Sequence, residues 1–240
     1  MADKRLKILG SDLIANGTRA FHLDRPNGFE YEAGQTIDLT LIEPKDMDAE
    51  GPVRTFSLVS APHEPELEFA TRMRDTAFKR TIGSAPAGTE LSWDGPYGSF
   101  TLHKNASKPA VFLAGGIGIT PFMSIVKDAL HKRLQHQLFL FHSNNTPEDA
   151  PFLDTLMALD HSDPNFHYVP TMTAMEKSEQ KWHGDHGFIT KDMIERHVID
   201  LATPIFYLAG PPGFVSAMRK MLAEAGADED NVRFEEFPGY

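Results

Sequence analysis

Residues 110–121 have the sequence Ala-Val-Phe-Leu-Ala-Gly-Gly-Ile-Gly-Ile-Thr-Pro, and they decide how the second half of the chain folds. The first five residues predict a short buried strand, and the apolar residues that recur beyond the proline predict a helix. Between them, glycines with positive φ allow a tight turn, the threonine can cap the helix, and the proline suits its first turn. Free amides and the positive end of the helix then meet at one point, which favours a bound pyrophosphate. The residues of this predicted cradle are Gly115, Gly116, Gly118, Thr120 and Pro121; an ordinary glycine turn is the alternative.

The rest of the second half repeats this rhythm of strand and helix. The expected strands are residues 110–114, 137–142, 166–170, 205–209 and 232–236, and the expected helices are residues 121–134, 150–159, 191–197 and 213–225. Such alternation predicts an α/β doubly wound parallel sheet that binds ligands at the carboxyl ends of its strands. The polar segment 174–187 is expected to be a mobile loop. Its His183, Asp185 and His186 are residue types that bind metals, but no further ligand is placed beside them and we predict no metal site.

The first half of the chain has the pattern of short strands. They are expected at residues 6–14, 18–24, 35–42, 55–60, 67–73 and 90–93, with one short helix at residues 77–82. Six closely spaced strands predict a six-stranded antiparallel β-barrel. We therefore expect two domains, residues 1–102 and residues 108–240, joined by the polar segment 103–108.

Composition narrows the class of protein. The 240 residues include no cysteine, so no disulfide, thiol nucleophile or cysteine-bound iron–sulfur cluster is expected in this chain. The net charge of −11 argues against a nucleic-acid-binding protein, which needs a basic face. No apolar run reaches about 18 residues and no basic, apolar leader is seen. We expect a cytoplasmic protein without membrane insertion.

Four motifs occur in one order along nearly the whole chain, and together they are far more specific than any one alone. They are Arg-Thr-Phe-Ser at 54–57, Gly-Pro-Tyr-Gly-Ser-Phe at 95–100, Gly-Gly-Ile-Gly-Ile-Thr-Pro at 115–121 and Ala-Gly-Pro-Pro-Gly-Phe at 209–214, followed by an aromatic, acidic end. This order resembles the ferredoxin–NADP reductase family of flavoenzymes. The resemblance implies a flavin-binding barrel, a domain for NADH or NADPH, and a flavin ring held in the cleft between them.

The resemblance also implies which residues hold the flavin. Arg54 would pair with the flavin phosphate, because a guanidinium fits phosphate oxygens. Phe56 stands where the family usually has a tyrosine stacked on the flavin ring, and Ser57 would lie beside the reactive nitrogen. Residues 72–80 match, more loosely, the family's second flavin-phosphate loop, in which backbone amides at the start of a helix would face the pyrophosphate. This match implies FAD more than FMN. The flavin-binding residues implied here are Arg54, Thr55, Phe56, Ser57, Arg72, Thr76, Ala77, Phe78 and Lys79.

The same basic segment, residues 72–80, is either a solvated charge cluster or a docking face for an acidic electron carrier. In the second half, the resemblance places Thr120 near the nicotinamide and the segment of Gly210, Pro211 and Pro212 at the coenzyme. Ala209 stands where many relatives have a cysteine. No arginine occurs at residues 142–145 or 173–174, which favours NADH, although Lys177 and Lys181 leave NADPH open.

The C-terminal residues resemble the family's ending, in which a carboxylate and an aromatic ring reach the flavin. Glu235 and Phe237 match that spacing, and Tyr240 lies beyond it. An aromatic ring on the flavin would have to move before the nicotinamide docks, which would make it a gate. The alternative is an edge strand with a frayed tail.

The sequence therefore predicts an NAD(P)H-dependent flavoprotein reductase with Ser57 and Glu235 as catalytic residues. It would take hydride from NADH or NADPH onto FAD and pass electrons to a separate acceptor, such as a ferredoxin-like protein, a flavodoxin or an oxygenase component. Two alternatives stay open: a reductase of free flavin or ferric iron, and an accessory subunit that senses redox state without turnover.

Overall fold

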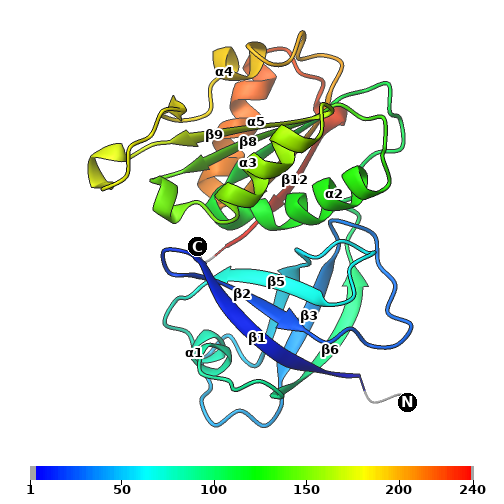
Figure 1. The fold of residues 1–240 in the computed structure, drawn as a ribbon, viewed down its shortest axis with the longest axis vertical. Helices are drawn as coiled ribbons and strands as arrows, with labels where there is room; N and C mark the ends of the chain where they lie inside the picture. Colours follow the sequence, from blue (N-terminus) through cyan, green and yellow to red (C-terminus); the bar gives the residue numbers. More distant parts are fainter. Residues whose placement is uncertain (1–3, 239–240) are drawn as a thin grey trace.

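The computed structural model describes residues 4–238, which form two six-stranded sheets stacked along the long axis of the molecule (Figure 1). The first sheet contains β1 (Arg5–Ala15), β2 (Thr18–Leu23), β3 (Thr36–Leu41), β4 (Val53–Ser57), β5 (Leu67–Arg72) and β6 (Glu90–Tyr97), with helix α1 (Ala77–Gly83) between the last two strands. All of its strand pairs are antiparallel, in the order β4-β3-β6-β1-β2-β5.

This first sheet curls into a barrel. A bridge between Leu58 and Phe69 joins the end of β4 to β5, so the two edges of the sheet meet. Alternate residues of the strands point inward, as the period of two requires, and Phe21 and Phe69 are fully buried among them together with Phe78 of α1. The expected barrel and its single short helix are both confirmed.

The second sheet is parallel throughout, in the order β10-β9-β8-β7-β11-β12. Its strands are β7 (Ala110–Gly115), β8 (Leu138–Asn144), β9 (Phe166–Met172), β10 (Asp185–His186), β11 (Ile205–Gly210) and β12 (Val232–Glu236). The helices are α2 (Thr120–His131), α3 (Leu153–Ser162), α4 (Lys191–Glu195) and α5 (Pro212–Glu224), with 3-10 turns at Gly116–Ile119, Pro147–Asp149, Met175–Lys177 and Glu229–Asn231. None of the helices in residues 4–238 is long and apolar enough to cross a membrane.

Strand β7 explains why helices cover both faces of this sheet. Ala110, Phe112 and Ala114 pack in the cluster that includes α2 and α3, whereas Val111 and Leu113 pack in the cluster that includes α4 and α5. A strand that is buried on both faces needs apolar residues at every position, which is what the sequence supplies. The predicted doubly wound sheet is confirmed.

The barrel and the parallel sheet share one apolar cluster. Val59 and Phe100 from the first half pack with α2 residues of the second half, and the Ser124 hydroxyl donates a hydrogen bond of 2.6 Å to the Ser60 carbonyl. Strand β12 runs toward the barrel (Figure 1).

Two local predictions were wrong. Thr120 does not cap α2, because a 3-10 turn precedes the helix and takes Thr120 into its first residue, where the hydroxyl donates to the Ile117 carbonyl at 3.2 Å. The segment 174–187 is not all loop, since Asp185 and His186 pair with β9 as a short edge strand.

Candidate active site

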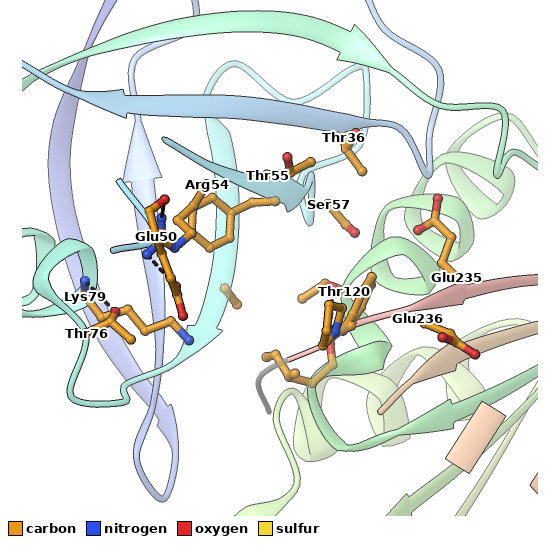
Figure 2. Close-up of a pocket in the computed structure, with 15 residues that line it drawn as sticks. Thr36, Glu50, Arg54, Thr55, Ser57, Thr76, Lys79, Thr120, Glu235 and Glu236 are labelled. Carbon is orange, nitrogen blue, oxygen red and sulfur yellow. Dashed lines mark hydrogen bonds and ion pairs between the residues drawn. The ribbon is translucent and has the colours of Figure 1, made fainter. Parts of the chain in front are cut away.

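A cavity of about 520 Å³ lies between the barrel and the parallel sheet (Figure 2). One wall comes from β4 and the start of α1, and the other comes from the turn after β7 and from the end of β12. The lining residues are Thr36, Glu50, Arg54, Thr55, Phe56, Ser57, Ala70, Thr76, Lys79, Ile117, Thr120, Glu235, Glu236, Phe237 and Pro238. We call this space the barrel cavity. It collects polar side chains from segments that are far apart in the sequence.

Two polar atoms at the barrel cavity are buried without a partner. Among residues 4–238, neither the Ser57 hydroxyl nor Glu235 Oε2 has a hydrogen-bond partner, and the two residues come from opposite walls (Figure 2). Burial raises the pKa of the Glu235 carboxyl to about 7, so this group holds a proton at neutral pH much more readily than an exposed glutamate. Unpaired buried polar atoms are costly unless a ligand completes them. Their presence indicates a binding site here.

The far end of the barrel cavity is cationic. Lys79 is only 7% exposed, and burial together with the nearby charges of Arg74 and Arg54 lowers its pKa to about 8. Thr76 caps α1 by accepting from the Lys79 amide at 3.4 Å. Arg54 lies at the same end and pairs with Glu50 at 2.6 Å (Figure 2). Arginine and lysine at one end of a cavity suit an anionic group.

Aromatic residues close the barrel beneath this cavity. Phe56 lines the cavity, but its ring packs mainly inward, with ring centroids 4.4 Å from Phe69 and 5.8 Å from Phe78. Phe78 itself is fully buried and does not line the cavity. On the other wall, the Phe237 amide donates to the Gly210 carbonyl at 2.9 Å, which fixes the tail of β12 against β11.

A second cavity of about 490 Å³ lies at the carboxyl ends of β7, β8, β9 and β11. Its lining residues are Arg72, Arg74, Gly115, Gly116, Ile117, Ser143, Asn144, Asn145, Thr173, Phe188, Ile189, Pro211, Gly213, Phe214, Ala217 and Met218. We call it the sheet cavity. Ile117 lines both cavities, so a ligand in one lies next to a ligand in the other. This is the position at which parallel sheets of this type bind ligands.

The glycine turn shapes the boundary between the cavities. Gly116 adopts a φ of 54°, and a Cβ at Gly118 would lie only 2.1 Å from the Ala209 carbonyl oxygen. Gly118 therefore lets the turn pack directly on β11. His142 is completely buried, its pKa is lowered to about 4 by burial, and its Nε2 donates to the Gly116 carbonyl at 2.9 Å. A neutral histidine thus holds the turn in place.

Arg72 and Arg74 reach the sheet cavity from the barrel half. A Cβ at Gly116 would lie 3.1 Å from Arg72 Nη2, which shows how closely the guanidinium approaches the turn. Arg72, which the sequence assigned to the flavin, lines the sheet cavity and not the barrel cavity. Arg74 was noticed only as part of a basic segment. The two arginines supply positive charge that the strands of the sheet itself do not.

The site residues predicted from the sequence divide into three groups within the described part of the chain. Nine line the barrel cavity: Arg54, Thr55, Phe56, Ser57, Thr76, Lys79, Thr120, Glu235 and Phe237. Arg72, Gly115, Gly116 and Pro211 line the sheet cavity. Six line neither cavity, namely Ala77, Phe78, Gly118, Pro121, Gly210 and Pro212, and Tyr240 lies outside the described residues. The sequence did not single out Glu50 or Phe188, because a loop glutamate or a lone phenylalanine has no distinctive pattern, and Phe214 was quoted in a motif without a role of its own.

The basic segment 72–80 does not form one surface patch. Its four basic side chains separate, because Arg72 and Arg74 enter the sheet cavity and Lys79 enters the barrel cavity. Arg80 remains outside and pairs with Asp46 at 2.7 Å and with Asp75. No metal-binding cluster of three or more His, Cys, Asp or Glu side chains occurs in the described part of the chain.

Comparison with known proteins agrees with this geometry. Residues 112–220 match the family model of the oxidoreductase NAD-binding domain. The glycine betaine monooxygenase reductase subunit of Chromohalobacter salexigens is 26% identical over 92% of this chain and 60% of its own length. The reductase component of propane 2-monooxygenase of Rhodococcus jostii is 26% identical over 88% of this chain and 57% of its own length. This chain thus spans about three fifths of the curated relatives it matches.

This chain resembles the ferredoxin–NADP reductase family in its NAD-binding domain and in its fold. A ferredoxin NADP+ reductase from Neisseria gonorrhoeae, solved with bound FAD and NADP, has the same fold, with a TM-score of 0.82 at 22% identity, and the match covers 98% of this chain and 99% of that one. The resemblance indicated by the four sequence motifs is confirmed.

Proposed function

We propose that this chain is an NAD(P)H-dependent flavoprotein reductase that binds FAD in the barrel cavity and NADH or NADPH in the sheet cavity. The observation that carries the proposal is the pair of buried, unpartnered atoms, Ser57 Oγ and Glu235 Oε2, beside the point where the cavities adjoin. FMN is the less favoured flavin. The proposed domains are residues 1–102 for the flavin and residues 108–240 for the coenzyme.

The residues of the barrel cavity fit a flavin nucleotide. Arg54 and Lys79 would hold its phosphate end, with Thr76 beside them, and Ser57 would hydrogen-bond the ring near Thr120 and Phe237. A flavin held by these residues would supply the chemistry of hydride acceptance from the nicotinamide and of electron release to an acceptor. Glu235 would hold a proton on its carboxyl group at the same place. The protein's contribution is to orient the two groups and keep that proton available.

The sheet cavity fits the coenzyme. The turn after β7 offers backbone amides and Arg72 offers a guanidinium for the pyrophosphate. The sequence argument for NADH rested on the absence of arginine at residues 142–145 and 173–174, but Arg72 and Arg74 enter the same cavity from the barrel. Both coenzymes therefore remain in the proposal.

The proposed acceptor is a separate protein. The curated relatives named above are reductase components of monooxygenases, and a corresponding oxygenase component or a ferredoxin-like or flavodoxin carrier is the proposed partner here. A cytoplasmic location belongs to the same proposal.

The test is a steady-state assay of NADH or NADPH oxidation by the purified chain, with ferricyanide as acceptor, with and without added FAD. We expect oxidation that requires FAD and falls about tenfold in Ser57→Ala, because one hydrogen bond to the ring is lost. Unchanged coenzyme in the presence of both FAD and acceptor would contradict the proposal.

A second candidate function treats flavin as a substrate that is released after reduction. The ion pair between Glu50 and Arg54 favours this second function, because the ion pair occupies the guanidinium that is proposed to hold the flavin phosphate. Gel filtration of the FAD-loaded protein separates the two functions: flavin that elutes with the protein supports a bound cofactor, and flavin that elutes later supports a substrate.

A further inference from the structure

The loop between β3 and β4 carries three acidic side chains that pair with groups of β4 and α1, and one of them, Glu50, lines the cationic end of the barrel cavity. Asp46 pairs with Arg80 at 2.7 Å, Asp48 Oδ2 accepts from the Ala77 amide at 2.7 Å, and Glu50 pairs with Arg54 at 2.6 Å. The Ala77 amide is the main cause of the lowered pKa of Asp48. The loop therefore places carboxylates where the proposed flavin phosphate would bind.

Both terminal nitrogens of the Arg54 guanidinium are engaged in this arrangement. Its Nη1 donates to the carbonyls of Glu50, Gly51 and Val53 at 3.1, 2.9 and 2.7 Å. Its Nη2 contacts the Glu50 carboxylate at 2.6 Å and the Asp48 carboxylate at 3.5 Å. A guanidinium binds phosphate through two parallel N–H donors, so one of these contacts has to break first.

Glu50 is the contact that can leave. Its side chain is 65% exposed, whereas that of Arg54 is 16% exposed and that of Asp48 is 29% exposed. Asp48 is held further by the Ala77 amide and by the Glu50 amide at 3.0 Å. An exposed carboxylate returns to water at little cost, because exposed ion pairs contribute little to stability. The side chain of Glu50 can thus turn away while the loop stays in place.

We propose that Glu50 competes with the flavin phosphate for Arg54 and so sets the affinity for phosphorylated flavins. This inference rests on the proposed function, because it requires flavin in the barrel cavity. Each binding event exchanges a carboxylate for a phosphate on the same guanidinium, so part of the phosphate's attraction is spent on displacing Glu50. Riboflavin has no phosphate, and its affinity is independent of this exchange.

The experiment measures Kd for FAD, FMN and riboflavin by quenching of flavin fluorescence in the flavin-free full chain. Glu50→Gln keeps the size of the side chain and removes the competing charge. Glu43→Gln is the matched control, since Glu43 is an exposed residue of the same loop and lines neither cavity. Circular dichroism establishes that each variant is folded.

We expect Glu50→Gln to bind FAD and FMN about tenfold more tightly than the wild-type chain, because a charged competitor for the guanidinium is removed. Riboflavin affinity should stay within about twofold, and Glu43→Gln should behave as wild type for all three flavins. Unchanged or weaker FAD binding in Glu50→Gln, or an equal gain for riboflavin, would overturn the inference while leaving the proposed function intact. Failure of every variant to bind any flavin would instead overturn the proposed function.

Discussion

The two cavities of this molecule each gather positive charge for a phosphate, but they treat it differently. In the barrel cavity, Arg54 is neutralised by Glu50 and Asp48. In the sheet cavity, no carboxylate within residues 4–238 forms an ion pair with Arg72 or Arg74. A phosphate can therefore reach Arg72 and Arg74 without displacing an anion. If the barrel cavity binds flavin and the sheet cavity binds the coenzyme, as proposed, competition with a carboxylate would affect flavin binding and not coenzyme binding.

The largest expected effect is that of Gly118→Ala, which disturbs the packing of the turn beside the sheet cavity on β11. The added Cβ would lie 2.1 Å from the Ala209 carbonyl oxygen, which belongs to backbone and cannot rotate away. We expect a loss of roughly 3 kcal/mol in the free energy of unfolding, which corresponds to a fall in Tm of roughly 10 °C in calorimetry.

The matched control for that variant is Gly213→Ala. Gly213 lies near the start of α5, and a Cβ there would meet nothing within 4 Å. Alanine favours a helix over glycine, so we expect no fall in Tm. Equal Tm values for the two variants would contradict the close packing of the turn on β11.

The next effect in size is that of Arg54→Ala on the barrel cavity. Removing the guanidinium takes away both donors for the phosphate, and we expect FAD binding to weaken about 100-fold in a fluorescence titration. Arg54→Lys keeps the positive charge but loses the two parallel donors of the guanidinium. Its Kd for FAD should lie between those of the wild-type chain and of Arg54→Ala. An unchanged Kd for FAD in Arg54→Ala would show that the phosphate binds elsewhere.

Glu235→Gln tests the proton on the buried carboxyl group in the barrel cavity. Because burial raises the pKa of the Glu235 carboxyl to about 7, the wild-type group is protonated below that pH and charged above it. With FAD saturating, we expect the wild-type rate of coenzyme oxidation to fall as pH rises through 7. In Glu235→Gln the rate should be about tenfold lower at acidic pH and lack this step.

The control for this pH profile is Glu236→Gln, which alters the neighbouring exposed carboxylate at the same cavity. It should keep the wild-type profile. A step near pH 7 that survives in Glu235→Gln would assign the titration to another group.

The smallest effect is expected from Arg72→Gln, and it sharpens the comparison of the two cavities. The side chain approaches Gly116 in the sheet cavity, so KM for NADH and NADPH should rise about fivefold. The Kd for FAD should stay within about twofold. The reverse pattern, weaker FAD with unchanged KM, would return Arg72 to the flavin as the sequence first suggested.

The sequence predicted the fold well where local chemistry determines it. The five apolar residues of β7 suit a strand buried on both faces, and the glycines beyond it favour a turn. Strand β12 was predicted with its observed bounds, Val232–Glu236. By contrast, the two-residue strand β10 has no local signal, because pairing with β9 alone creates it.

The site was predicted less completely than the fold, for a physical reason. The motif at residues 54–57 does line the barrel cavity, because its position on β4 follows from strand geometry. Arg72 ends its strand where the two halves meet, and the sequence does not specify which cavity its long side chain enters. Glu50 reaches Arg54 only through the shape of the loop between β3 and β4, so its role becomes visible only in three dimensions.

The most direct test of the central claim is the visible spectrum of the FAD-loaded chain, recorded anaerobically while NADH and then NADPH are added in equal amounts. The account predicts that the oxidised flavin band bleaches with at least one coenzyme, with the faster coenzyme defining specificity. A flavin band that stays oxidised with both coenzymes would contradict the assignment of the two adjoining cavities to flavin and nicotinamide.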